Sequence, residues 1–200
     1  MSPDVQLADH QPATSGPQLT MRRVRLRPVR DADLPFLYGL MTAPESGARV
    51  RFAGATPSPA QVAASLWEDV LAQFIIETTT GRALGLFVLS SPNFRDGYAY
   101  LSVLGMPGAT GRGSVAIGGM LGVHYAFSTW PFRKFYMEAS ETSYAAFGSG
   151  LGRLFAEEGR LRNHAYFDGR YQDLRILAVY RETWARLAPR YLKSNGRAGP

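Results

Sequence analysis

Short stretches that are apolar, or that alternate between apolar and polar residues, predict seven strands along the chain. A turn around Gly81 joins the second and third strands, and a turn at residues 92–97 leads into the fourth. The Asp168-Gly169 pair is typical of a tight hairpin and joins the last two. We expect the strands at residues 24–28, 73–79, 83–89, 98–105, 135–139, 161–167 and 174–180.

Apolar residues at helical spacing predict helices between these strands. The first helix begins with a carboxylate at Asp31, and the second with Ser58 as N-cap and Pro59 at its first position. The first should bury Leu34, Leu37, Tyr38 and Met41, and the second Val62, Leu66, Trp67, Val70 and Leu71. Further helices are expected at residues 114–127, 145–155 and 182–191.

Length and composition suit one compact domain. The chain has 200 residues, 46% of them hydrophobic, which is enough for a substantial core. Residues 1–20 lack periodicity and predict a mobile leader, and residues 193–200 predict a mobile tail. The domain is therefore expected at residues 21–192.

The charged and sulfur-containing residues exclude several classes of function. Although the net charge is +6, the densest arginine run, residues 22–30, alternates with Val24 and Leu26. That spacing favours a strand with one solvated face, so we do not expect nucleic acid as a partner. The chain has no cysteine and three scattered histidines, so we expect no metal site. Without a long apolar run or a signal sequence, we expect a cytoplasmic protein that does not enter a membrane.

A glycine-rich turn between the strand at residues 98–105 and the following apolar helix is the main candidate for ligand binding. Glycines let the backbone approach a ligand, and the free N–H groups of a first helical turn favour an anion such as pyrophosphate. Many helices that bind nothing begin in the same way, so that alternative stays open. The candidate residues are Thr110, Gly111, Arg112, Gly113 and Ser114.

Three glycines inside that helix indicate a close neighbour, because each glycine costs a helix about 1 kcal/mol against alanine. They are Gly118, Gly119 and Gly122. A strand backbone is the expected neighbour, with a bound ligand as the weaker alternative.

The order of elements and four short segments resemble the GNAT superfamily of acyl-CoA N-acyltransferases, in particular the branch of ribosomal-protein-alanine N-acetyltransferases. The segments are residues 26–34, Pro107 to Gly113, Tyr125-Ala-Phe127, and residues 158–162 with Asp168-Gly-Arg and Asp173. The resemblance implies an α+β fold with flanking helices. Its mixed, mostly antiparallel sheet of about seven strands would be splayed around a CoA cradle.

The same resemblance assigns acetyl-CoA, or another acyl-CoA, to the glycine-rich turn. Backbone N–H groups of Leu104, Gly105 and Met106 would hold the pantetheine and the thioester, and residues 110–115, including Val115, the pyrophosphate. Two positions depart from the family pattern. Thr110 stands where relatives carry Gln or Arg, and Val115 where they carry Gly or Ala.

For the chemistry, the resemblance points to Glu138 as the base that deprotonates the amine, and to Ser143 or Tyr144 as the acid that protonates the thiolate. A solvent-facing Glu138 paired with an arginine is an open alternative. Weaker candidates for the base are Glu77, Asp96 and His164.

The acceptor would be a primary amine, either of a protein N-terminus or of a small molecule. Arg51, Phe52, Tyr166 and Trp184 are possible walls of its site, and Asp173 would either line that site or fix the last hairpin. A homodimer through the edge of that hairpin is possible. The alternative function is a non-catalytic module that senses acyl-CoA or binds another protein.

Overall fold

The computed structural model describes residues 19–43, 52, 54–106, 112–141, 144, 152–167 and 169–192. Residues 1–18, the predicted tail and most of the helix predicted at 145–155 lie outside the described residues. The elements are β1 (Thr20–Met21), β2 (Val24–Pro28), the 3-10 turn η1 (Asp31–Asp33), α1 (Leu34–Thr42), α3 (Pro59–Ser65), β3 (Val70–Thr78), β4 (Ala83–Asn93), β5 (Tyr98–Gly105), α4 (Arg112–Thr129), β6 (Lys134–Ser140), β7 (Ala156–Phe167), β8 (Arg170–Tyr180) and α6 (Arg181–Leu192).

The described strands form one mixed sheet with the order β1-β2-β3-β4-β5-β6-β8-β7. Every neighbouring pair is antiparallel except β5 and β6, which are parallel. This confirms the predicted α+β fold with a mostly antiparallel sheet. The additional strand is β1, which pairs with β2 across a turn where Arg22 has a φ of 55°. Its two residues are too few for a periodic pattern to reveal.

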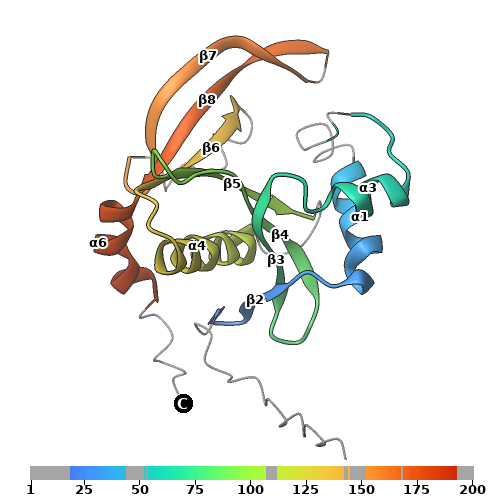
Figure 1. Cartoon of the computed structure of the whole chain (residues 1–200), viewed down its shortest axis with the longest axis horizontal. Helices are drawn as coiled ribbons and strands as arrows, with labels where there is room; N and C mark the ends of the chain where they lie inside the picture. The colour runs from blue at the N-terminus through green and yellow to red at the C-terminus, as the bar shows by residue number, and fades with distance from the viewer. Residues whose placement is uncertain are drawn as a thin grey trace, which may run out of the picture.

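Helices cover both faces of the sheet (Figure 1). On one face, α4 and α6 pack on a core that includes Ile76, Phe87 and Phe135. On the other face, α1 and α3 enclose a smaller core that includes Leu37 and Leu86. We call the second side the α1–α3 face. None of the helices in the described part of the chain is long and apolar enough to cross a membrane.

The three glycines of α4 lie where the helix meets the strands. An added Cβ would lie 2.4 Å from a methyl carbon of Ile76 at Gly118, and 2.4 Å from the Phe87 ring at Gly122. At Gly119 it would lie 3.2 Å from Val103. A close neighbour is confirmed, but it consists of the side chains of Ile76, Val103 and Phe87 rather than of strand backbone.

The second predicted helix is shorter than its apolar pattern suggests. Helix α3 ends at Ser65, and Val70 and Leu71 already belong to β3. Trp67 is 58% exposed in the turn between them, so its assignment to a buried helix face was wrong. Val70 pairs with Ser90 of β4, so this segment forms a strand although its apolar residues have helical spacing. Burial in a sheet overrides the local preference for a helix.

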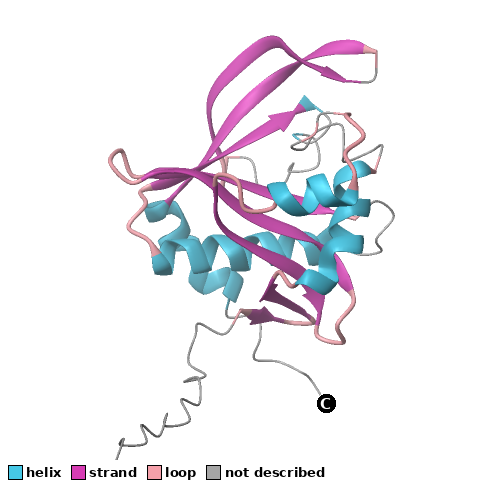
Figure 2. Cartoon of the chain, turned by 45° about the vertical axis from the view of Figure 1, so that its right-hand side comes forward, coloured by secondary structure: helices cyan, strands magenta, loops and turns pink. Residues whose placement is uncertain are grey.

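The last hairpin is longer than predicted, because β7 begins at Ala156 and β8 at Arg170. Figures 1 and 2 show it arching away from the helices of the described part of the chain. Strand β7 is the edge of the sheet and most of its residues are exposed. Because residues on both faces of β7 are exposed, most of the strand shows no alternation of apolar and polar residues, and the sequence pattern missed it.

Candidate active site

Strands β5 and β6 run together at their starts and separate toward their ends (Figure 1). Their pairing covers only Tyr98–Tyr100 against Lys134–Tyr136. Strand β5 continues to Gly105 in register with β4, while β6 continues to Ser140 in register with β8. We call the region between residues 101–105 and residues 137–140 the gap. It is the splay that the family resemblance implied.

The closed end of the gap is held by hydrogen bonds to backbone oxygens. The Arg133 N–H donates to the Gly97 oxygen at 2.7 Å, and Arg133 Nε donates to the Asp96 oxygen at 2.9 Å. Arg181 then ties the turn before β6 to the end of α4 by donating to the carbonyl oxygens of Phe127, Trp130 and Phe132. The two strands are therefore fixed at one end and free to diverge at the other.

The backbone of β5 offers donors to the gap at alternate residues. The Met106 N–H donates to the Leu84 oxygen at 2.9 Å. Hydrogen bonds of an antiparallel pair alternate, so Gly105 directs its N–H and C=O away from β4, into the gap. Val103 does the same two residues earlier. Of the three residues predicted as donors, Gly105 therefore remains available, while Leu104 and Met106 face β4.

The first turn of α4 lies beside the end of β5. Val115 packs against Gly105, where an added Cβ would lie 3.3 Å from a Val115 methyl. Gly113 is exposed, and no described atom lies within 4 Å of the place where its Cβ would be. The first N–H groups of α4 have no partner within the helix, as at every helix start. Thr110 and Gly111 lie outside the described residues, as does the Arg112 side chain; Ser114 is half-buried.

Glu138 lies on β6 at the open part of the gap. Alternation along the strand puts it on the same face as Tyr136, because Met137 and Ala139 are buried in the core on the opposite face. Glu138 is exposed and makes no hydrogen bond or ion pair with the described residues, so the predicted alternative of an arginine partner is not found among them. Its carboxylate is available to an incoming group.

Tyr100 is the last residue of β5 that pairs with β6, and it lies close enough to Glu138 to be affected by its charge. Burial raises the pKa of the Tyr100 phenol, and the negative charge of Glu138 raises it further. The Tyr100 ring packs on Tyr136 with ring centres 5.6 Å apart. A neutral phenol thus lies beside a free carboxylate.

A partly buried ion pair between Lys134 and Glu158 fixes these aromatic rings. Lys134 Nζ donates to both oxygens of Glu158, at 2.9 and 2.7 Å, and lies 4.4 Å from the centre of the Tyr136 ring. The Tyr136 hydroxyl donates to the same carboxylate at 2.8 Å, and so does that of Tyr180. Burial would raise the pKa of Glu158, but the hydrogen bonds from Lys134, Tyr180 and Tyr136 outweigh it and lower the pKa.

Tyr144 lies on the other side of the sheet from Glu138. It packs against the core beneath α4, and the Arg175 guanidinium lies 4.2 Å from the centre of its ring. The predicted acid and the predicted base thus lie on opposite faces of the sheet. Ser143 lies outside the described residues.

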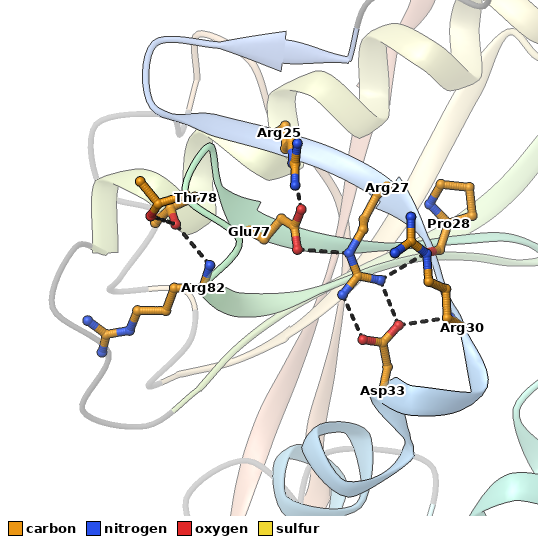
Figure 3. Close-up of polar contacts among 9 residues, drawn as sticks. Arg25, Arg27, Pro28, Arg30, Asp33, Glu77, Thr78 and Arg82 are labelled. Carbon is orange, nitrogen blue, oxygen red and sulfur yellow. Dashed lines mark hydrogen bonds and ion pairs between the residues drawn. The ribbon is translucent and has the colours of Figure 1, made fainter.

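The weaker candidates for the base have other roles. Glu77 is 1% exposed and receives hydrogen bonds from Arg25 at 2.5 Å and Arg27 at 2.8 Å (Figure 3). Asp96 bonds to Asn93 within the turn between β4 and β5. His164 is exposed on β7. None of the three lies at the gap.

Asp173 fixes the last hairpin. It accepts a hydrogen bond from the Asn163 N–H at 2.9 Å and pairs with Arg160, at the irregular register between Leu161 and Ala165. The hydrogen bond from the Asn163 backbone, followed by that from Arg160, lowers the pKa of Asp173. The structural alternative for Asp173 is therefore supported.

The possible acceptor-site walls are spread over the molecule. Trp184 is 3% exposed in the core under α6, so it is not a wall, and Tyr166 is 64% exposed on β7. Phe52 packs on the α1–α3 face, and Arg51 lies outside the described residues. Position in the sequence alone could not distinguish the core tryptophan from a pocket residue.

A cavity of about 310 Å³ opens on the α1–α3 face, over β3, β4 and β5. Leu104 and Ser102 of β5 belong to its lining, which places it beside the gap. The sequence patterns missed Asp69 in this lining, because residues 66–71 were assigned to a helix. The polar Glu68-Asp69 pair was the available signal. The lining is Met41, Leu66, Asp69, Val70, Gln73, Leu86, Val88, Ser90, Ser91, Ser102 and Leu104.

No group of three or more histidine, cysteine, aspartate or glutamate side chains suitable for a metal occurs among the described residues. What the site offers is a gap with backbone donors, an open helix start, a free carboxylate and a neighbouring cavity.

No family model and no curated protein sequence matches the chain. Solved structures do. A spermidine N-acetyltransferase from Vibrio cholerae in complex with CoA and spermine matches with a TM-score of 0.71 and 20% identity, over 82% of this chain and 98% of that one. A spermidine/spermine N-acetyltransferase from Vibrio cholerae in complex with manganese ions matches with a TM-score of 0.69 and 20% identity, over 82% and 96%.

These proteins are members of the GNAT superfamily, so the comparison confirms the fold that the sequence resemblance implied. The finer resemblance to the ribosomal-protein-alanine branch stays a prediction, because these two neighbours act on polyamines. At 20% identity, what the chain shares with these N-acetyltransferases is the fold.

Proposed function

We propose that the protein is an acetyl-CoA-dependent N-acetyltransferase that acts on a primary amine. The observation that carries the proposal is the separation of β5 from β6 beyond Tyr100, with the first turn of α4 beside the end of β5. The shared fold with N-acetyltransferases supports it. Unpaired strand backbone inside a sheet is costly unless a ligand completes it, which also favours a bound extended group.

The residues present fit acetyl-CoA. The open space at Gly113 and the free N–H groups of the first turn of α4 suit a pyrophosphate, since a helix start favours negative charge. The Gly105 and Val103 N–H groups would bind the pantetheine arm and polarise the thioester carbonyl, an oxyanion-hole effect worth about 3–4 kcal/mol. When bound, acetyl-CoA supplies an activated acetyl group.

Glu138 is our candidate for the base. A protonated amine has no lone pair for attack, so one proton must leave it before the new C–N bond forms and the C–S bond breaks. Glu138 would accept that proton directly or through a water, with the Tyr100 phenol as a hydrogen-bond donor beside it.

Tyr144 is our candidate for the acid that donates a proton to the departing thiolate, and Ser143 stays a second one. Tyr144 lies on the α4 side of the sheet and Glu138 on the α1–α3 face. Amine and thiolate would thus exchange protons with residues on different faces of the sheet, which keeps the base from competing for the acid's proton.

The test is acetyl transfer to a panel of amines that includes peptides with free N-termini, followed by thiol release. Glu138→Gln should lower kcat about 100-fold or more with the KM for acetyl-CoA little changed, because it removes a base and leaves the cradle intact. Glu182→Gln on exposed α6 is the matched control and should behave as wild type. Tight acetyl-CoA binding without turnover of any amine would overturn the proposal in favour of a sensing module.

A further inference from the structure

Three tyrosine rings pack on one another where β5 and β6 still pair. The ring centres of Tyr98 and Tyr100 of β5 lie 5.4 and 5.6 Å from that of Tyr136 of β6, and 6.3 Å from each other. Ala99, between the first two, is buried in the core beneath α4, so alternation puts the three rings on the α1–α3 face. Glu138 occupies the next position of that face along β6. We call these three rings the tyrosine cluster.

Tyr136 is the member of the cluster that a hydrogen bond fixes. Its hydroxyl donates to Glu158 Oε2 at 2.8 Å, and Lys134 Nζ lies 4.4 Å from the centre of its ring. The hydroxyls of Tyr98 and Tyr100 make no hydrogen bond with the described residues. The Tyr136 ring is thus held at its hydroxyl and over its face, whereas the other two rings are held by packing alone.

The acceptor that fixes Tyr136 is itself well held. Glu158 accepts from Lys134 Nζ at 2.9 and 2.7 Å, and the two side chains are 23% and 8% exposed. Burial disfavours the charged form of both groups, but their hydrogen bonds outweigh it, raising the pKa of Lys134 and lowering that of Glu158. Both therefore stay charged at neutral pH. A hydrogen bond to an ionised acceptor is stronger than one between neutral groups, which favours one position of the Tyr136 ring.

Tyr136 packs on the Tyr100 phenol beside Glu138. Burial contributes most to raising the pKa of Tyr100, followed by the charge of Glu138 and then by the phenols of Tyr98 and Tyr136. On the β4 side, Tyr100 pairs with Ser90, which carries no charge. Tyr100 therefore keeps its proton at neutral pH, and a neutral phenol can donate a hydrogen bond to a carboxylate.

We propose that Tyr136 is a positioning residue for acetyl transfer: Glu158 fixes its hydroxyl, and its ring holds the Tyr100 phenol beside Glu138. This role rests on the N-acetyltransferase function proposed above. The hydrogen bond from Tyr100 orients the Glu138 carboxylate, and the proton that leaves the amine nitrogen goes to a Glu138 oxygen. Tyr100 and Tyr136 keep their own protons throughout. Loss of the anchor at Glu158 lets the Tyr136 ring move, so Glu138 is less often in the productive orientation.

Tyr136→Phe and Tyr180→Phe form a matched pair for the test. Each removes one hydroxyl that donates to Glu158, but Tyr180 lies on β8 and its ring does not contact the tyrosine cluster in the described part of the chain. We expect Tyr136→Phe to lower kcat about three- to tenfold and to change the KM for acetyl-CoA less than twofold. Tyr180→Phe should leave both constants within about twofold of wild type. Equal effects of the two variants on kcat would overturn the proposal, because the Glu158 hydrogen bonds would then be merely structural.

The pKa of the Tyr100 phenol gives a second measurement that needs no acetyl transfer. It can be followed by NMR of protein labelled with 13C at the tyrosine Cζ atoms, with the signal assigned by Tyr100→Phe. In the wild type we expect a pKa above the usual value of about 10. Tyr136→Phe should bring it closer to that value, and Tyr136→Leu, which also removes the covering ring, closer still. Tyr180→Phe should leave it unchanged.

The two measurements separate the positioning role from the proposed function. If acetyl transfer occurs and Tyr136→Phe has no more effect on kcat than Tyr180→Phe, the positioning role is wrong and the function stands. If no amine is acetylated, the function is wrong, and the NMR titration alone decides whether Tyr136 holds Tyr100. In either case, a pKa of Tyr100 that is the same in Tyr136→Phe, Tyr136→Leu and wild type overturns the contact on which the role depends.

Discussion

Arg27 on β2 holds two carboxylates at once (Figure 3). Its NH1 and NH2 donate to the two oxygens of Asp33, both at 2.7 Å, and its Nε donates to Glu77 at 2.8 Å. The hydrogen bonds to Asp33 contribute most to raising the pKa of Arg27. Since Asp33 is the N-cap of α1, this network joins the first helix to two strands of the sheet.

This network makes the free energy of unfolding depend on pH in the acidic range. The Arg27 hydrogen bonds lower the pKa of Asp33, and the Glu77 pKa is lowered because the bonds from Arg27 and Arg25 outweigh the effect of its burial. A lowered folded pKa gives stability that is present above the unfolded pKa values of about 4 and lost as the pH falls through the folded pKa. Urea unfolding should therefore show the free energy of unfolding falling below about pH 4.

Asp33→Asn should remove part of that dependence. At pH 7 we expect it to lower the free energy of unfolding by about 1–3 kcal/mol, because it breaks charge-assisted hydrogen bonds. At pH 3 the difference from wild type should be smaller. Asp31→Asn, the same change at an exposed position two residues away, is the control. Equal effects of the two variants at pH 7 would contradict the account.

At the scale of elements, α4 packs closely on the sheet through three glycines. Gly118, Gly119 and Gly122 let it lie directly on Ile76, Val103 and Phe87. The same close packing brings its first turn to the end of β5, where Val115 meets Gly105. Core packing therefore sets the distance between the helix start and the gap.

Gly122→Ala tests this packing. The added methyl would lie 2.4 Å from the Phe87 ring, and overpacking of this kind costs about 1–3 kcal/mol, against a gain of about 1 kcal/mol in helix propensity. We expect a net loss of stability in urea unfolding. Gly113→Ala on the same helix has open space and should cause no loss. A Gly122→Ala protein as stable as wild type would show that α4 does not lie this close to β4.

The elements themselves were largely predictable from sequence, and their ends were not. Apolar alternation and turn residues located β2 to β6, because those signals are local. The end of α3 at Ser65 depends on the pairing of Val70 with Ser90 across the sheet, a long-range contact that no window of neighbouring residues contains. The extension of β7 back to Ala156 has the same origin, since it pairs with Ala178.

At the scale of the whole molecule, the sheet separates the proposed acid from the proposed base. The start of α4 and Tyr144 lie toward one face, and Glu138 lies with the tyrosine cluster on the α1–α3 face. The gap between β5 and β6 connects the two faces of the sheet. The glycine-rich turn and Glu138 could be proposed from sequence through the family resemblance. The contacts of Tyr136 with Tyr100 and Glu158 could not, because only folding brings these residues together.

The central claim is that the gap and the start of α4 bind acetyl-CoA, and isothermal titration of acetyl-CoA into the full chain tests it most directly. We expect micromolar binding, weakened at least tenfold in Gly113→Trp, whose side chain fills the open space beside the first turn of α4. Ala185→Trp on the exposed side of α6 is the control and should bind as wild type. No binding by the wild type, or unchanged binding by Gly113→Trp, would contradict the account.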